Sequence, residues 1–336
     1  MKPSREIGSI ALLVVAALGV LAGMVWLSGV APGEALVGLF RGSLGSPNAI
    51  NGTIRETTPL LIAGIAVFLA LRAGLFNIGV EGQLLMGACA AAAVALAVPG
   101  AFGMVLAIGA GIGAGALWAL PAGLIKAYRG GHEVITTIML NAVALNVTAA
   151  LVAGPMKGSG QQAPTTANLS PSSMLPVLWQ SGPLRISLAV FLALAVLAAF
   201  AFWYRRYVAA YELRLTGANP EAARFAGVRT PRVQASAMTL SGAIGGLAGA
   251  VQVLGYEGRF YANFSPGYGF DALGVAILAG SGPLGLIPSA LFFGILNQGS
   301  TRLQILGIPK GITWIVLAML IIVFATVRYR RTQTHD

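Results

Sequence analysis

Six side chains that could bind a solute lie within or beside long apolar stretches of the sequence. They are Phe76, Asn77, Glu81, Gln83, Trp118 and Asn141. Amides donate and accept hydrogen bonds and a carboxylate accepts them, so these groups suit the hydroxyls and ring edges of an uncharged ligand. The two aromatic rings could pack against a flat ring of that ligand. The six residues therefore predict a narrow and mostly neutral pathway for a small polar solute.

A structural interpretation of the same polar side chains stays open. Asn77 and Gln83 could cap the end of a broken helix, and Glu81 could pair with Arg72. Asn141 could hydrogen-bond a neighbouring helix. Polar groups in apolar surroundings are costly unless they are paired or wetted, so each must satisfy one of the two interpretations.

A polar segment at 205–232 contains a short predicted helix. At 219–227, Pro220 suits the first turn, Glu221 the positive N-terminal end and Gly227 the C-terminal stop. A helix of about two turns is marginal alone in water, so we expect it to pack against another surface. That surface is either the layer of lipid headgroups or a cytoplasmic partner protein.

Catalytic chemistry in this chain is disfavoured by its residue types. None of the four lysines follows a glycine, which excludes the phosphate-binding loop Gly-x-x-x-x-Gly-Lys-Ser/Thr. The two histidines, His132 and His335, lack the spacing of a zinc-protease helix, and Cys89 is the only cysteine. We expect no enzymatic role, no metal and no cofactor, so any ATP must be bound by a partner chain.

The elements that position these residues are membrane spans. Of 336 residues, 57% are hydrophobic and 9% are charged, against roughly 25% charged in soluble domains. The mean hydropathy is +0.81, and the apolar residues suffice for roughly nine or ten spans of about 20 residues. A net charge of +11 then reflects Lys and Arg retained in cytoplasmic loops. We expect contact with membrane lipid and no nucleic-acid partner.

We predict a single all-α transmembrane domain over 1–336, with about ten transmembrane helices. The spans are 8–28, 58–71, 83–98, 102–125, 133–153, 186–204, 233–254, 270–281, 285–300 and 311–328. With both termini inside the cell, 14 of the 21 Lys and Arg fall on the inner side and 7 on the outer side, which favours this orientation. The first run is longer than the core of a signal peptide, so we interpret it as a span.

Two of these spans are too short to cross about 30 Å as plain helices. They are 58–71 and 270–281, and each neighbours a Gly-rich polar stretch, 74–82 and 255–269 respectively. On the predicted topology one stretch faces the cytoplasm and the other faces outward, which indicates two inverted repeats. The first half would be spans two to five, about 58–153, and the second half spans seven to ten, about 233–328, with the coupling loop at 205–232 between the halves.

Many of the 45 glycines have spacings that favour close packing of helices. They include Gly109, Gly111, Gly113, Gly115, Gly242, Gly245, Gly246 and Gly249. We interpret these as structural. The polar, Pro-rich loop 154–182 could be a connector or a surface that meets an extracytoplasmic partner.

Four sequence motifs resemble a known family of transport proteins. EAARFAG at 221–227 resembles the loop of bacterial ATP-binding-cassette import permeases that docks on the ATPase. GLFNIGVEGQLLMG at 74–87, GHEVITTIMLN at 131–141 and ELRLTGANP at 212–220 resemble permeases of the ribose/branched-chain-amino-acid type, in particular the nucleoside and simple-sugar branch. The resemblance covers spans two to ten.

The resemblance implies a multi-pass permease of the bacterial plasma (inner) membrane. Its implied partners are a cytoplasmic ATPase with two cassettes, a second homologous permease in a heterodimer and an extracytoplasmic substrate-binding lipoprotein. The coupling residues implied by the loop motif are Pro220, Glu221, Ala222, Ala223, Arg224 and Gly227.

The expected function is therefore import of nucleosides as one subunit of an ATP-binding-cassette importer. Simple sugars or branched-chain amino acids are the alternative substrates of the same machine. A hypothesis of another class is a secondary transporter or channel that acts alone, driven by an ion gradient.

Overall fold

A computed structural model describes residues 29–309, together with residues 19, 23, 26, 311 and 315. The helices are α2 (Pro32–Ser43), α3 (Pro47–Arg72), α4 (Val80–Ala97), α5 (Ala101–Arg129), α6 (Glu133–Ala153), α7 (Leu188–Arg206), α8 (Val208–Ala218), α9 (Pro220–Phe225), α10 (Thr230–Gln252), α11 (Tyr268–Leu278) and α12 (Leu286–Ile305). Short turns are η1 (Pro171–Ser173), η2 (Val253–Glu257) and η3 (Pro283–Gly285). The predicted spans 8–28 and 311–328 lie almost wholly outside the described residues. The two chain ends, whose predicted position is inside the cell, also lie outside them.

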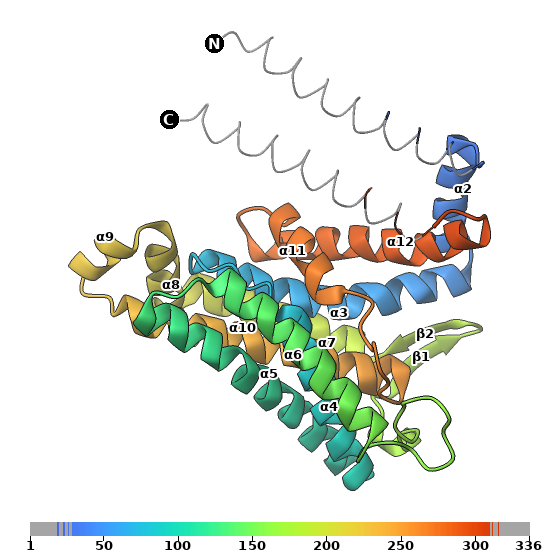
Figure 1. Ribbon diagram of the computed structural model, residues 1–336. Helices are drawn as coiled ribbons and strands as arrows, with labels where there is room; N and C mark the ends of the chain where they lie inside the picture. Colours follow the sequence, from blue (N-terminus) through green and yellow to red (C-terminus); the bar gives the residue numbers. More distant parts are fainter. Residues whose placement is uncertain are drawn as a thin grey trace.

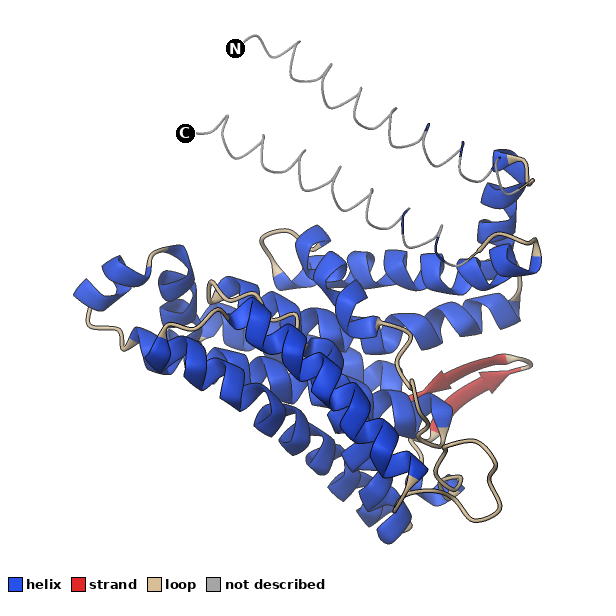
Figure 2. Ribbon diagram, viewed as in Figure 1, coloured by secondary structure: helices blue, strands red, loops and turns tan. Residues whose placement is uncertain are grey.

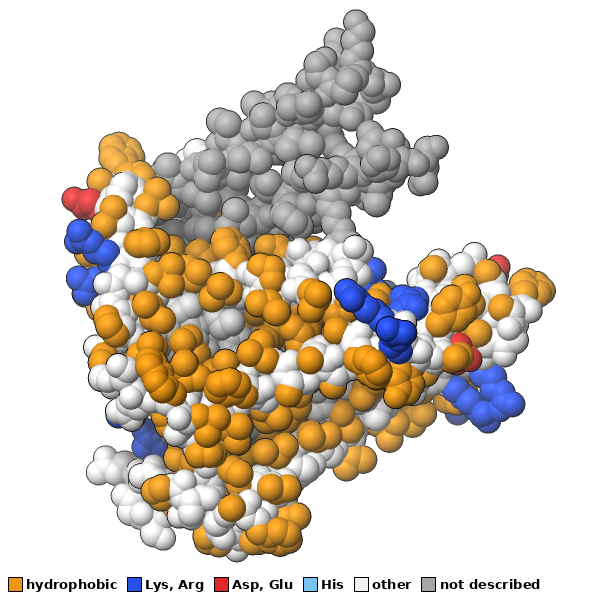
Figure 3. All heavy atoms as spheres, turned by 180° about the vertical axis from the view of Figure 1, so that it is seen from behind, with side chains coloured by type: hydrophobic (Ala, Val, Ile, Leu, Met, Phe, Trp, Pro, Cys, Tyr) orange, Lys and Arg blue, Asp and Glu red, His pale blue; other side chains and the backbone are white. Residues whose placement is uncertain are grey.

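Six described segments are long and apolar enough to cross a membrane. They are α3, α4, α5, α6, α7 and the segment Thr230–Glu257, which joins α10 to η2. Helix α6 has the predicted bounds 133–153, and α11 is short, with 11 residues, as the sequence indicates. On the face turned away from the viewer in Figure 1, hydrophobic side chains dominate and few Lys or Arg interrupt them (Figure 3). Such a surface suits contact with lipid.

The helices form two groups that meet along α3 and α10. Helices α4, α5, α6 and α10 pack together, while α2, α11 and α12 gather on α3 (Figure 1). Helices α8 and α9 extend from one end of the bundle, and the loop between α6 and α7 lies at the other end. The bundle thus separates the predicted coupling segment from the predicted outer loop.

The expectation of a purely α-helical chain is wrong at one place. Strands β1 (Val177–Ser181) and β2 (Leu184–Ser187) form an antiparallel hairpin that projects from the helices (Figure 2). The turn Gly182-Pro183 has Gly182 at a φ of 57°, a value that favours glycine. The backbone N–H of Arg185 donates to the Asn51 side chain, which fixes the hairpin to α3.

The predicted short span at 58–71 is also wrong, because α3 has 26 residues and Pro59 lies inside it. The helix begins at Pro47, twelve residues before Pro59, which the prediction took as its N-terminal boundary. Ser46 accepts a hydrogen bond from the Ala49 N–H and caps the start. The hydroxyl of Thr58 donates to the Ile54 carbonyl at 2.7 Å, so the polar side chain of Thr58 is satisfied within the helix itself.

Glycines bring α5 and α10 into backbone contact, but only on one face of α5. A Cβ added at Gly111 would lie 2.7 Å from the Cβ of Ala250, and one at Gly115 would collide with the backbone of Gly242 and Gly246. A Cβ at Gly109 or Gly113 would meet nothing within 4 Å. The packing role expected for these last two glycines is therefore wrong, because positions two apart point to different sides of a helix.

This contact predicts that Gly115→Leu destabilises the bundle. The new side chain must separate α5 from α10, and overpacking of this kind costs about 1–3 kcal/mol or more. The melting temperature and the folded yield of the purified protein in detergent should both fall. Gly109→Leu in the same helix is the matched control and should leave both unchanged. Equal melting temperatures for the two variants would contradict the packing described.

Candidate functional site

Two helices begin inside the bundle, and their first turns touch. Helix α4 starts after the loop 73–79, and α11 starts after the loop 258–267. The backbone N–H of Gly269 donates to the Glu81 carboxylate at 2.7 Å. A Cβ at Gly269 would lie 2.8 Å from the Cβ of Glu81, so a glycine is required for this approach. A carboxylate at a helix N-terminus is also favoured by the helix dipole.

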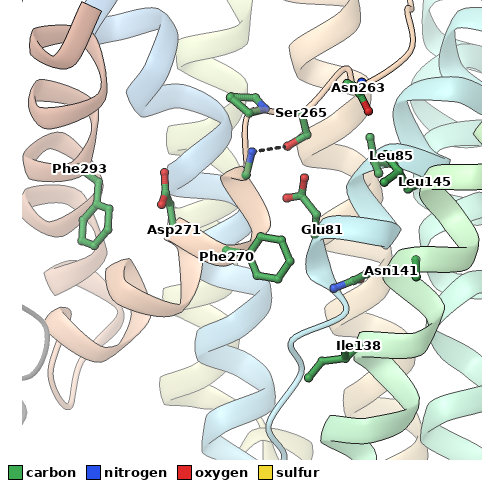
Figure 4. A pocket seen from close by; sticks show the side chains of 13 residues that line it. Glu81, Leu85, Ile138, Asn141, Leu145, Asn263, Ser265, Phe270, Asp271 and Phe293 are labelled. Atoms are coloured by element: carbon green, nitrogen blue, oxygen red, sulfur yellow. Dashed lines mark hydrogen bonds between the residues drawn. The ribbon is translucent and has the colours of Figure 1, made fainter. Parts of the chain in front are cut away.

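A cavity of about 770 Å³ lies beside this contact. Its lining residues are Glu81, Leu85, Ile138, Asn141, Ala142, Leu145, Asn263, Ser265, Pro266, Gly267, Phe270, Asp271 and Phe293. Figure 4 shows Glu81 from α4 and Phe270 from α11 near one another, with Asn141 entering from α6. Apolar walls with a few polar groups that converge on one space are the usual form of a small-molecule site.

The Asn141 side chain lines the cavity and also hydrogen-bonds the residues at the start of α4. Its side-chain oxygen accepts from the Gly82 N–H at 2.8 Å, and its amide nitrogen donates to the Ile78 carbonyl at 2.9 Å. Both bonds cross from α6 to the start of α4. The side chain therefore fixes this helix end while it lines the cavity, and the predicted hydrogen bond to a neighbouring helix is confirmed.

The other predicted pathway residues do not line this cavity. Asn77 is fully buried, donates to the Ser241 hydroxyl at 2.8 Å and accepts from the Gly79 N–H at 3.0 Å. Gln83 pairs with Asn77 through two hydrogen bonds of 3.1 Å. Trp118 donates its ring N–H to the Leu140 carbonyl, and Phe76, within the loop before α4, is 39% exposed.

The sequence indicated Glu81 and Asn141, but the cavity residues of the second half were missed. They are Asn263, Ser265, Phe270, Asp271 and Phe293. The available signal was the polar stretch 255–269, the counterpart of 74–82, which contains Asn263 and Ser265 and ends just before Phe270 and Asp271. Asn263 has a φ of 58°, the only non-glycine residue with positive φ in the described part of the chain. Such a strained backbone position is common at binding sites.

Arg72, the alternative partner of Glu81, lies at the other end of α11. Its guanidinium donates to the Gly280 carbonyl and lies 4.7 Å from the centroid of the Phe68 ring. The Glu81 carboxylate is directed to Gly269 instead. Among residues 29–309, no three His, Cys, Asp or Glu side chains come together as a metal site.

The predicted coupling loop, 205–232, contains the predicted short helix α9. Asn219 caps α9 by accepting hydrogen bonds from the N–H groups of Glu221 and Ala222, both at 3.0 Å. Gly227 follows with a φ of 84°. Ala223 faces inward, whereas Phe225 is 94% exposed. Helix α8 was not expected from the sequence. It precedes α9, and both helices project from one end of the bundle (Figure 1).

One backbone contact joins the predicted coupling loop, 205–232, to the loop before α4. Gly217, near the end of α8, lies so close to residues 72–74 that an added Cβ would approach the backbone N of Gly74 within 2.8 Å. Gly74 has a φ of 72°. The two glycines therefore connect α8 to the loop that carries Asn77 and leads to Glu81.

A family model described as branched-chain amino acid transport system / permease component matches residues 49–325. The chain belongs to this family. The permease is 34% identical to the glucose ABC transporter permease protein TsgB13 of Haloferax volcanii, over 95% of this chain and 87% of the relative.

Two further relatives have names that refer to nucleosides. The permease is 35% identical to the guanosine ABC transporter permease protein NupP of Bacillus subtilis, over 94% of this chain and 92% of that one. It is 30% identical to the nucleoside ABC transporter permease protein NupB of Lactococcus lactis, over 85% and 82%. No solved structure gives a significant match. As a member of a permease-component family, the protein is a multi-pass membrane transport subunit.

The position of Asn77 predicts that Asn77→Ala acts on stability before solute affinity. The variant strands the Gly79 N–H and the Gln83 amide, and unpaired buried partners cost about 1–3 kcal/mol. The melting temperature of the permease should fall, and transport of every substrate should decline alike. Asn146→Ala is the control, because that exposed amide bonds only to the Ala142 carbonyl of its own helix. A native melting temperature with selectively weaker affinity for one solute would reassign Asn77 to the pathway.

Proposed function

We propose that the permease is the membrane subunit of an ATP-binding-cassette importer of nucleosides in a bacterial plasma membrane. The observation that carries this proposal is the cavity between α4 and α11, with two carboxylates, two amides and aromatic walls. The names of the relatives from Bacillus subtilis and Lactococcus lactis support the substrate class.

The cavity suits both parts of a nucleoside. Ribose hydroxyls can donate to the carboxylates of Glu81 or Asp271 and accept from the Asn263 amide. A flat base can stack on Phe270, whose ring is half exposed toward the cavity. A volume of about 770 Å³ is within the usual range for pockets that hold small organic ligands.

Glucose is the second candidate substrate, because the relative from Haloferax volcanii is named for it. A sugar would use the same carboxylates and amides but has no base to stack. Competition for uptake between a purine nucleoside and glucose, measured in proteoliposomes that hold the assembled importer, distinguishes the two.

Two inverted halves are supported by the directions of α4 and α11. Both helices start at the contact between Glu81 and Gly269. Helix α11 runs toward Gly280, which accepts from Arg72 at the end of α3. Helix α4 runs away from Arg72 toward Gly100, whose N–H donates to Ser173 in the opposite loop. Half-helices that diverge from one site are expected of inverted repeats in a ten-span transporter.

The partners follow from the same proposal. The names of the relatives refer to two permeases for one solute, NupP and NupQ in Bacillus subtilis and NupB and NupC in Lactococcus lactis, which supports a heterodimer. A cytoplasmic ATPase with two cassettes would bind ATP, and an extracytoplasmic lipoprotein would deliver the nucleoside. The loop around α9 would be the docking element for the ATPase.

Closure of the ATPase would move α9, and the contact between Gly217 and Gly74 would pass this movement to the start of α4. Because Glu81 in the first turn of α4 also caps α11, a shift of α4 would reshape the cavity and alternate its access. Uptake that follows an ion gradient in vesicles holding this chain alone, without ATP, would favour a secondary transporter or channel instead.

The stacking role predicts that Phe270→Ala weakens nucleoside uptake by the assembled importer. Loss of aromatic stacking on a base costs about 1–3 kcal/mol, so KM should rise roughly 5- to 150-fold. Phe191→Ala is the control, because Phe191 on α7 is 49% exposed and Phe270 is 50% exposed. An unchanged KM for Phe270→Ala in radiolabelled uptake assays would remove Phe270 from the site.

The docking role predicts that Phe225→Ala weakens binding of the ATPase without affecting the fold. An aromatic side chain with 94% exposure contributes little to the packing of its own chain, whereas interface anchors of this type are worth about 2 kcal/mol or more. The Kd for the ATPase should rise at least about 30-fold, and ATP-driven uptake should fall with it. Tyr211→Ala on α8, another exposed aromatic, should retain native affinity. Equal affinities for the two variants would place the docking surface elsewhere.

A further inference from the structure

The outer loop between α6 and α7 is hydrogen-bonded along the segment that forms one wall of the cavity. The N–H of Thr166 donates to the Phe260 carbonyl at 2.9 Å, and the Ala262 N–H donates to the Pro164 carbonyl at 3.1 Å. The N–H of Leu169 donates to the Gly258 carbonyl at 2.7 Å. The two segments therefore lie antiparallel, as in a short sheet.

Thr166 is the side chain at the centre of this pairing. It is fully buried, and its hydroxyl oxygen accepts from the Phe260 N–H at 3.0 Å. The same hydroxyl donates to the Ala167 carbonyl at 2.9 Å. With the backbone bond from the Thr166 N–H, Phe260 is held through both its N–H and its carbonyl. A valine at position 166 would keep the shape of the side chain but lose the hydroxyl.

Phe260 stands at the start of the cavity wall. Its ring stacks on that of Phe264, with centroids 4.9 Å apart, and both side chains are buried. Asn263 and Ser265, which line the cavity, lie on either side of Phe264. The hydroxyl of Ser265 accepts from the N–H of Tyr268 at 3.2 Å and so caps α11. The wall is thus anchored at Phe260 by the outer loop and at Tyr268 by the helix.

We infer that Thr166 is a positioning residue of the transport site. It sets the place of Asn263 and the first turn of α11 through Phe260, so that the outer loop tunes the affinity of a cavity that it does not line. The exposed turn at 159–164 belongs to the same hydrogen-bonded segment. This inference rests on the proposed function for its transport measurement.

The test compares Thr166→Val with Thr148→Val in the assembled importer. Thr148 is the matched control, because its buried hydroxyl bonds only within α6, to the carbonyls of Ala144 and Leu145. We expect Thr166→Val to raise the KM for nucleoside about three- to ten-fold, with the maximal rate and the basal ATPase rate unchanged. Thr166→Ser, which keeps the hydroxyl, should restore the native KM.

Amide hydrogen exchange of the peptides covering 258–270 provides a readout that needs no transport. Exchange should accelerate in Thr166→Val and remain native in Thr148→Val and Thr166→Ser. If the native importer moves no nucleoside, the proposed function fails while this comparison still tests the positioning of the wall. The inference is overturned by native exchange in Thr166→Val. It is equally overturned by a native KM, or by a joint loss of yield and maximal rate that Thr166→Ser does not restore.

Discussion

Backbone N–H groups at the start of a helix cannot remain unpaired inside a membrane, and this constraint decides how α4 and α11 begin. The structure meets it with side chains from other elements. Asn141 on α6 accepts from Gly82 in the first turn of α4, and Glu81 on α4 accepts from Gly269 in the first turn of α11. The three helices are therefore linked at one point, and the cavity lies beside that point.

The same groups that satisfy the backbone also give the cavity its polar character. Glu81 and Asn141 are held in place by bonds to N–H groups before any solute enters, so their geometry is set by the scaffold. Asn77, Gln83 and Ser241 form a second, buried network beside the start of α4. Preorganisation of this kind reduces the entropy lost on binding.

The two loops that precede α4 and α11 are contacted by elements from opposite ends of the molecule. The loop before α4 touches α8 through Gly74 and Gly217, and the loop before α11 is paired with the outer segment around Thr166. Each of these two contacts therefore adjoins one of the two helices that flank the cavity. In the importer that we propose, these two contacts would give a single site one physical input from each side of the membrane, as alternating access requires.

The apolar runs and glycine spacings by themselves determined that the chain is a membrane protein with α6 at 133–153 and a short α11, because hydropathy and length are local properties. Local rules also predicted the helix around Pro220, whereas its cap at Asn219 was found only in the structure. They failed at Pro59 and at Gly109, since neighbouring helices decide whether a proline is tolerated and which face of a helix is packed. Only the tertiary structure decided that Glu81 meets Gly269 and that Thr166 holds Phe260, because 188 and 94 residues separate these partners and no local pattern encodes their contact.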